Sequence, residues 1–204
     1  MSTTSRTRLS PEQRREQLLD LGVRLLAHRS LDELSIDLLA EEAGISRGLL
    51  YHYFGSKQAF HEAVVRHAAD DLIAQTTPPT DGDPLERLLT SVTAYVDYVV
   101  ANHEGYVSLV KAAAGGNESL RAIYEDARSA LNSRIFREDA RLHSGEGEII
   151  ADTPANRLVV RGWSAMVEEL VLSWIDDPRG VTRDDLLAII TGSLPAIVGA
   201  SPGE

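Results

Sequence analysis

A short stretch of this chain gathers hydrogen-bond donors and cations between residues 46 and 57. The side chains concerned are Ser46, Arg47, Tyr51, His52 and Lys57, with Gly48 among them. No Asp or Glu occurs from Ala43 to Ala59. Donors and positive charges in such a stretch suit contacts to phosphates and to the acceptor edges of bases. The stretch is therefore a candidate surface for a polyanion.

Two short helices and a turn are expected to position these residues. Ser35 is suited to cap a helix, because apolar residues follow it at helical spacing. They are Ile36, Leu39, Ala40 and Ala43. Gly44 can adopt the left-handed conformation that ends a helix, and Ser46 can cap the next one, which runs through about His52.

The stretch from Ser35 to Phe54, SIDLLAEEAGISRGLLYHYF, has the pattern of a helix-turn-helix. In that motif the second helix enters the major groove of DNA with its N-terminal residues nearest the bases. Arg47 can pair with a phosphate or a guanine edge. Leu50 and Phe54 are one turn apart and should face the core. Lys57 begins a fourth helix, where a phosphate would also meet free backbone N–H groups.

The segment AEEAGISRGLLYHYFGSKQAF resembles the N-terminal signature of the tetracycline-repressor (TetR) family of bacterial regulators. The resemblance covers about Pro11 to His67. It implies an all-helical homodimer with an effector pocket in the C-terminal domain and a dimer interface on the last two helices. By motif position it assigns DNA contacts to Ser46, Arg47, Gly48, Tyr51, His52 and Lys57, and the cap of the preceding helix to Ser35. Leu49 departs from a position that is often small or polar, so its base contact would be apolar, and Gln58 replaces a common acid.

Simpler interpretations exist for several of these residues. Ser35, Ser46 and Ser56 would serve as N-caps in any helical protein. Tyr51 alone is more often a core aromatic, and Arg47 alone is more often solvated. Gly48 inside a helix is harder to explain, because glycine costs about 1 kcal/mol relative to alanine there. Close approach of DNA would account for it.

The remainder of the chain also reads as helical, so the predicted fold class is all-α with about nine helices. A first helix should start after Ser10 and end near His28, and later ones should span about 84–102, 104–114, 117–141, 154–176 and 182–198. Breaks are expected at Thr76–Pro84, Gly115-Gly116, Ser144–Gly147 and Asp177–Gly180. This organisation predicts a DNA-binding domain over 10–55, a connecting helix over about 56–75, and a larger domain over 76–204 for effector binding and dimerisation.

Two sets of residues are candidates for the tasks of the larger domain. An effector pocket would be lined by Tyr95, Tyr98, Tyr106, Leu109, Tyr124 and Trp163, although aromatics at helical spacing are more often core. These apolar stripes carry no dominant charge, which favours a largely apolar effector. A symmetric interface would use Val167, Leu170 and Trp174 with Leu187, Ile190 and Leu194, and the alternative is a purely intramolecular core.

Composition restricts the remaining possibilities. The net charge is −11, but residues 1–66 hold nine basic and nine acidic residues, so the acidic excess lies in the remainder. The absence of cysteine excludes disulfides and thiol chemistry. The polar start, Met1 to Leu9, lacks the pattern of a signal peptide, which favours a cytoplasmic location.

Catalysis is the main rival class of function. Ser108 and Lys111 match Ser-x-x-Lys, and Gly162 to Ser164 resembles half a nucleophile elbow, but neither has the strand or spacing that the motif requires. The six histidines show no metal-ligand spacing. We therefore predict a regulator that is not an enzyme and needs no metal or cofactor: a repressor released from a palindromic operator by a small molecule. Alternatives are a ligand-responsive activator, or a helical partner-binding module that does not use its motif.

Overall fold

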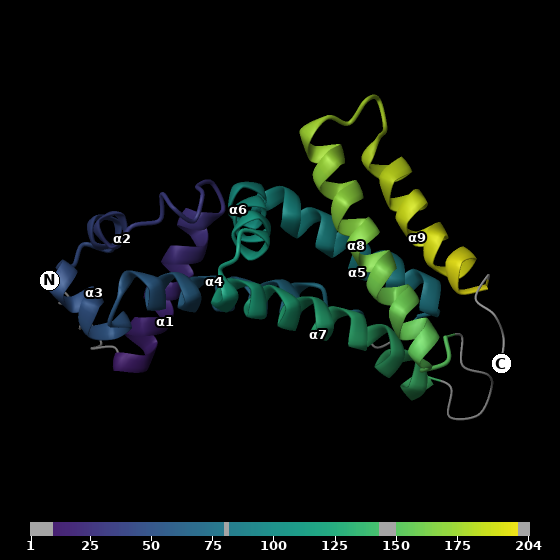
Figure 1. The fold of residues 1–204 in the computed structure, drawn as a ribbon, viewed down its shortest axis with the longest axis horizontal. Coiled ribbons are helices and arrows are strands. Elements are labelled where there is room, and N and C mark those ends of the chain that lie inside the picture. The colour runs from purple at the N-terminus through teal and green to yellow at the C-terminus, as the bar shows by residue number, and fades with distance from the viewer. Residues whose placement is uncertain (1–9, 80–81, 143–149, 200–204) are drawn as a thin grey trace, which may run out of the picture. The chain divides into compact units, whose positions relative to one another are not determined.

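The protein folds into helices throughout the part of the chain that the computed structural model describes, residues 10–79, 82–142 and 150–199. These residues contain no strand, which confirms the predicted all-α class. The helices, drawn in Figure 1, are α1 (Pro11–Leu26), α2 (Ile36–Ala43), α3 (Arg47–Phe54), α4 (Lys57–Gln75), α5 (Pro84–Ala101), α6 (His103–Ala114), α7 (Glu118–Leu142), α8 (Pro154–Asp176) and α9 (Arg183–Gly199). The predicted break at Ser144–Gly147 and the polar start, Met1 to Leu9, lie outside the described residues.

Local capping explains why the helices begin and end where the sequence indicates. Ser10 and Gln13 form a reciprocal capping box at the start of α1, in which each side chain accepts the other residue's backbone N–H. Ser35 Oγ accepts the Leu38 amide at 3.0 Å and starts α2. Gly44 then ends α2 in the left-handed conformation, at φ 63° and ψ 38°.

The chain divides into two compact units. The first comprises Met1–Ala68 and Asn102–Leu120, and the second comprises Ala69–Ala101 and Arg121–Glu204. Helix α6 thus groups with the N-terminal helices, whereas the sequence-based division assigns it to the domain over 76–204. That division, with its DNA-binding domain over 10–55, stays a prediction.

The core of the first unit fixes the helix-turn-helix on α1 and α4. Leu34, Leu39 and Leu50 are fully buried together with Phe60 and Val64 of α4. The rings of Phe54 and Phe60 meet edge to face, with centroids 5.2 Å apart. Such aromatic pairs add about 0.5–1.5 kcal/mol beyond their buried area. Helix α3 therefore packs on α4 through its last residue, and Leu50 is buried in the same core.

His61 on α4 is a half-buried titratable group in this unit. Its Nε2–H donates to the Leu34 carbonyl oxygen at 2.6 Å. Burial lowers the pKa of His61 below its ordinary value; the hydrogen bond to Leu34 opposes this, and the charge of Lys57 adds to it. Because the folded state resists protonation, the unfolded chain binds more protons once the pH falls through about 6.5. The stability that neutral His61 contributes is thus present above this pH and is lost below it.

We expect the urea midpoint of unfolding to fall between about pH 7.5 and about pH 5.5, in part through this histidine. His61→Gln keeps a side-chain N–H donor but cannot titrate, so its midpoint should fall less over the same range. His28→Gln, at an exposed position, is the matched control and should follow the wild type. A His61→Gln midpoint that falls as steeply as that of the wild type would contradict the assignment.

The second unit is built around the packing of α5, α8 and α9. Val96, Val99, Val160, Val171 and Ile190 are its fully buried side chains. Figure 1 shows α8 and α9 lying side by side, joined by the loop near Pro178. The Trp163 indole N–H of α8 donates to Ser193 Oγ of α9, and the Trp174 indole N–H of α8 donates to the Val181 carbonyl in the connecting loop, each at 2.9 Å.

None of the described helices is both long enough and apolar enough to cross a bilayer.

Candidate nucleic-acid interface

The second helix of the helix-turn-helix presents nearly all of its surface to solvent. Of the eight residues of α3, only Leu50 and Phe54 are buried. The remaining predicted contact residues on or beside this helix are all exposed: Ser46, Arg47, Gly48, Leu49, Tyr51, His52 and, at the start of α4, Lys57. Ser35 is half-buried. The packing therefore leaves a continuous polar surface free for a ligand, while contact of these residues with DNA stays a prediction.

The serines of this surface serve as N-caps. Ser46 Oγ accepts the Leu49 amide at 3.3 Å, and Ser56 Oγ accepts the Ala59 amide at 3.0 Å. In each bond the hydroxyl oxygen is the acceptor, so its proton remains available to a phosphate. Capping and DNA contact are thus compatible for Ser46.

Gly48 has no structural requirement within its own chain. A Cβ atom at this position would meet only Ser46 Oγ, at 3.9 Å, which is an ordinary van der Waals distance. Its backbone is helical and its φ is not in the left-handed region. The cost of glycine in a helix, about 1 kcal/mol, is therefore not offset by packing. Packing within the chain thus does not explain a glycine at this position. A ligand that approaches the backbone closely would explain it.

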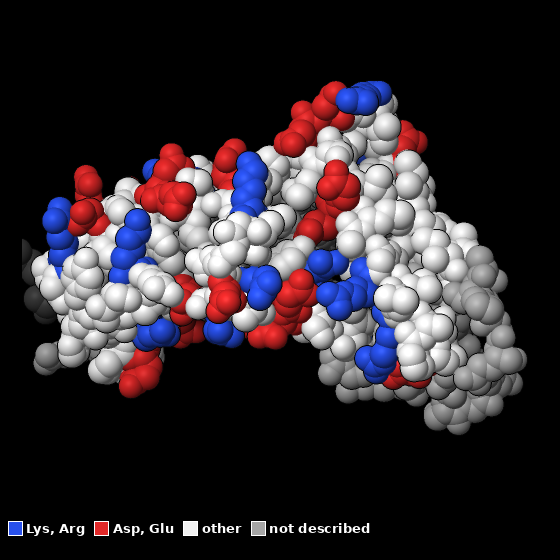
Figure 2. Space-filling model, viewed as in Figure 1, with Lys and Arg blue, Asp and Glu red and all other residues white. Residues whose placement is uncertain are grey.

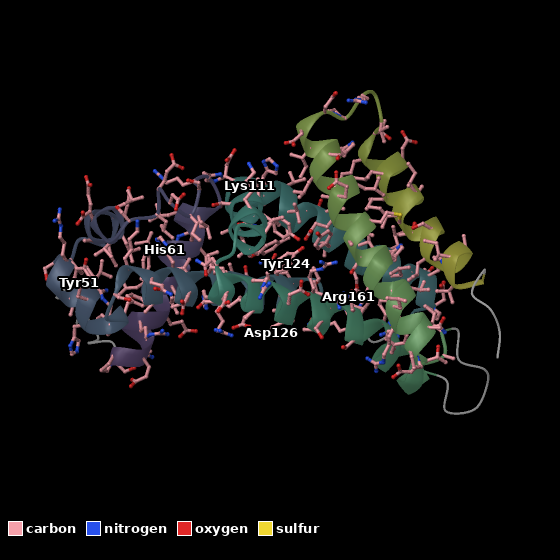
Figure 3. All side chains as sticks on the ribbon, in the orientation of Figure 1. Tyr51, His61, Lys111, Tyr124, Asp126 and Arg161 are labelled. Carbon is pink, nitrogen blue, oxygen red and sulfur yellow. The ribbon has the colours of Figure 1, made fainter. Side chains whose placement is uncertain are left out.

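Tyr51 and Lys57 occupy the outer part of the same surface. Tyr51 is 49% exposed and is labelled on α3 in Figure 3. Lys57 stands at the first residue of α4, whose first turn carries no acid. Within the described residues no ion pair involves Lys57. A free cation beside unpaired helix N–H groups is an arrangement that suits a phosphate.

Arg47 is not a free cation, which the sequence did not indicate. Its Nε pairs with Asp37 Oδ1 on the first turn of α2, and both side chains are more than half exposed. Asp37 lies ten residues away, outside the acid-free stretch, so sequence spacing gives no signal for the contact. The surface is consequently less positive around Arg47 than its composition predicts.

A second residue that sequence reasoning missed is Arg15 on α1. Its guanidinium lies over the Phe54 ring, with its carbon 5.3 Å from the ring centroid. Arg15 is exposed and places another cation beside the C-terminal end of α3. The amphipathic pattern of α1 marks it only as a solvent-facing residue.

The predicted effector residues are distributed over both units. Tyr106 and Leu109 belong to α6 and hence to the first unit, whereas Tyr95, Tyr98, Tyr124 and Trp163 belong to the second. Trp163 is 7% exposed and its indole N–H is used by Ser193, so it serves the core. Tyr124, labelled on α7 in Figure 3, donates its hydroxyl proton to Glu168 at 2.6 Å. Burial, followed by the bond to Glu168, raises the pKa of Tyr124, and burial with the charge of Asp71 raises that of Tyr98.

Four of the predicted interface residues lie within the protomer's own core. They are Val167, Leu187, Ile190 and Leu194, none of which is more than 7% exposed. Leu170 and Trp174 are partly exposed. The exposed residues of the two helices include small and apolar ones, Leu158, Gly162 and Ala165 on α8 and Ala188, Ile189 and Gly192 on α9, beside charged ones such as Arg157, Arg161 and Glu169 on α8.

The serine motifs considered for catalysis have structural uses. Ser108 Oγ accepts the Leu31 amide at 2.8 Å, and Lys111, labelled on α6 in Figure 3, is exposed. Ser164 donates to the Arg161 carbonyl in the middle of α8, without the strand that a nucleophile elbow needs. Among the described residues no cluster of three acids and histidines could hold a metal ion.

Comparison with known proteins covers most of the chain. Residues 18–64 match the family of bacterial regulatory proteins named tetR, and residues 84–193 match the tetracyclin repressor-like C-terminal domain. The chain is 25% identical over 179 residues to the transcriptional activator FasR of Mycolicibacterium smegmatis, covering 87% of this chain and 79% of that protein. It is 26% identical over 193 residues to the transcriptional regulator BetI of Vibrio vulnificus, covering 90% and 92%.

A solved structure shows the same architecture. It is a tetR-family transcriptional regulator from Streptomyces coelicolor, 32% identical to this chain. The two superpose with a TM-score of 0.79, over 93% of this chain and 82% of the other. The order of helices, with the helix-turn-helix first, is thus shared over nearly the whole length.

Proposed function

The chain belongs to the tetR family of bacterial regulatory proteins and is a helix-turn-helix transcription regulator, and we propose that it acts as a homodimeric repressor that a small-molecule effector releases from a palindromic operator. The observation that carries the proposal is the exposed surface of α3, held from behind by Leu50 and Phe54 alone. Two such helices would enter successive major grooves about 34–36 Å apart.

In this proposal the residues of the surface divide their tasks. Arg47, at the start of α3, reads a base edge, and Gly48 lets the backbone approach the groove. Lys57 and Arg15 bind phosphates, with Ser46, Tyr51 and His52 donating around them and Leu49 contacting a thymine methyl group. Ser35 acts as the cap of α2. A regulator with these contacts works where its DNA is, in the cytoplasm.

The dimer is proposed to form through α8 and α9. Figure 2 shows charged side chains gathered at the loop that joins these helices and hardly any along α9 below it. After Asp185 the exposed residues of α9 are small or apolar, which allows close packing of two copies about a twofold axis, while α8 also exposes Arg157, Arg161 and Glu169. Sedimentation in solution tests this: the proposal expects twice the chain mass of 22.3 kDa.

The effector is proposed to be a largely apolar small molecule bound by the C-terminal helices. The tyrosines at 95, 98 and 124 are the candidate lining residues in the second unit, and the hydroxyl of Tyr124 is held by Glu168. A coupling free energy of about 1–3 kcal/mol between effector and DNA would give a useful switch. Thermal-shift screening of metabolites should find a compound that raises the melting temperature and weakens DNA binding; compounds that stabilise the protein without weakening DNA binding would count against release by ligand.

Activation is a second candidate, because one relative is named an activator. Reporter expression from a regulated promoter, measured in a strain that lacks the gene and again after the gene is restored, distinguishes repression from activation. Expression that rises on deletion supports repression, and expression that falls supports activation.

The DNA proposal is tested by selecting duplexes from a random library with the wild-type protein. A palindromic sequence should be enriched, with binding that weakens as salt rises.

Arg47→Ala should then cost about 1–3 kcal/mol at one base pair and relax preference there. Lys57→Ala should weaken all duplexes alike and lower the salt slope by about one per site. No enrichment would reject the proposal, and a changed base preference in Lys57→Ala would reject the phosphate assignment.

A further inference from the structure

Two cations of the DNA-facing surface stand in different electrostatic surroundings. Lys57 has no ion pair among the described residues, whereas Arg47 is paired with Asp37. If the surface served only to attract phosphates, a carboxylate beside one of its cations would weaken it. The presence of Asp37 therefore requires a separate explanation.

Helix capping does not supply that explanation. A carboxylate in the first turn of a helix is favourable, and Asp37 lies in the first turn of α2. The Leu38 amide of this turn is bound by the hydroxyl of Ser35, so the cap does not depend on Asp37. The pair with Arg47 is also exposed on both sides, and exposed pairs contribute only about 0–1 kcal/mol to stability. Neither term makes Asp37 important to the fold.

The geometry of the pair is informative about recognition. Asp37 binds Arg47 through Nε, the inner nitrogen of the guanidinium group. No hydrogen bond within the described residues uses either terminal amino group of Arg47, so both can serve another acceptor. A guanine offers two acceptors, O6 and N7, to such a planar fork, while a phosphate accepts any cation. A tethered guanidinium loses less conformational freedom on reaching a base edge than a free one.

We propose that Asp37 is a specificity-determining residue, which positions Arg47 for a guanine edge and disfavours its use as a phosphate ligand. This rests on the proposed function, since it presumes that α3 reads DNA. In non-specific complexes the Asp37 carboxylate keeps the Arg47 guanidinium away from the DNA phosphates and itself repels them. In the specific complex the guanine edge uses the free end of Arg47, and the pair with Asp37 is kept.

The test compares Asp37→Asn with Glu42→Gln in the full-length protein. Glu42 is an exposed acid near the end of α2, so both variants remove one negative charge from the same helix. The probes are the selected palindromic duplex and a shuffled duplex of equal composition, titrated over a range of salt. Asp37→Asn should bind the shuffled duplex about three- to tenfold more tightly, with a salt slope steeper by about 0.9 per protomer. Its preference for the selected duplex should fall about tenfold. Glu42→Gln should change the affinities for the selected and the shuffled duplex by the same factor, so that the preference for the selected duplex is unchanged.

Two further variants separate positioning from mere charge. In an Arg47→Ala background, Asp37→Asn should no longer change the preference, because the residue acts through the arginine. Asp37→Glu keeps the carboxylate and should restore most of the preference. The proposal is overturned if Asp37→Asn behaves as Glu42→Gln does, or if its effect persists without Arg47. Failure of the wild-type protein to select any duplex would instead reject the proposed function.

Discussion

Gly105→Ala is expected to lower the free energy of unfolding by about 3 kcal/mol, at the upper end of what overpacking costs. Helix α6 lies so close to the end of α1 that a Cβ atom at this position would be 2.5 Å from the Leu26 carbonyl oxygen. It would also be 2.6 Å from Leu26 Cγ. A side chain could rotate away from such a contact, but a backbone carbonyl in a packed helix cannot. One of the two helices must therefore move.

Urea unfolding followed by circular dichroism measures this effect. Gly48→Ala is the matched control, because it makes the same change in a helix where the added methyl group meets only Ser46 Oγ, at 3.9 Å. It should raise stability by up to about 1 kcal/mol. If Gly105→Ala unfolded at the wild-type urea concentration, the close packing of α6 on α1 would be wrong.

The ends of the helices were predictable because local chemistry sets them. Ser10, Ser35 and Ser46 each stand before an apolar periodic run, and each caps the helix that follows. Gly44 ends α2 with a positive φ, as its position predicted. Caps and glycines act over three or four residues, so the sequence carries all the information that they need.

Partners far apart in the chain were not predictable in this way. Periodicity identifies the apolar face of α8 and α9, but it does not say whether this face meets its own chain or a second copy. Val167 and Ile190 were predicted for an interface, and they are buried inside the protomer. The adjacent small residues, such as Gly162 and Gly192, carry no hydrophobic signal, although they lie on the exposed surface.

The grouping of α6 with the N-terminal helices was missed for a similar reason. The linker Thr76–Pro84 suggested that everything after it belongs to one domain. The contact of α6 with the N-terminal helices depends on the absence of a side chain at Gly105 and on one hydrogen bond, from the Leu31 amide to Ser108 Oγ at 2.8 Å. In the sequence Ser108 matches half of a catalytic motif, whereas in the structure its hydroxyl accepts the Leu31 amide. A glycine and a serine in a helix do not reveal such a contact in sequence.

Gly48→Ala is expected to have opposite effects on the two properties of the protein. It should stabilise the free protein by up to about 1 kcal/mol, since alanine favours the helix and the methyl group finds no neighbour closer than Ser46 Oγ at 3.9 Å. It should weaken binding to the selected duplex by about 1–3 kcal/mol, the usual cost of forcing a methyl group into a closely packed contact. Thermal unfolding and fluorescence anisotropy on the same preparation measure both.

The opposite signs make this variant more informative than a loss of binding alone. A substitution that weakens DNA binding by damaging the fold lowers the melting temperature as well, and Gly48→Ala should raise it. Any DNA affinity lost must then come from the interface. Because helix propensity favours alanine at an exposed position, a glycine there has to be kept by something outside the free protein. If Gly48→Ala bound the selected duplex as tightly as the wild type, the start of α3 would not lie against the groove, and Arg47 would lose its assigned access to the bases.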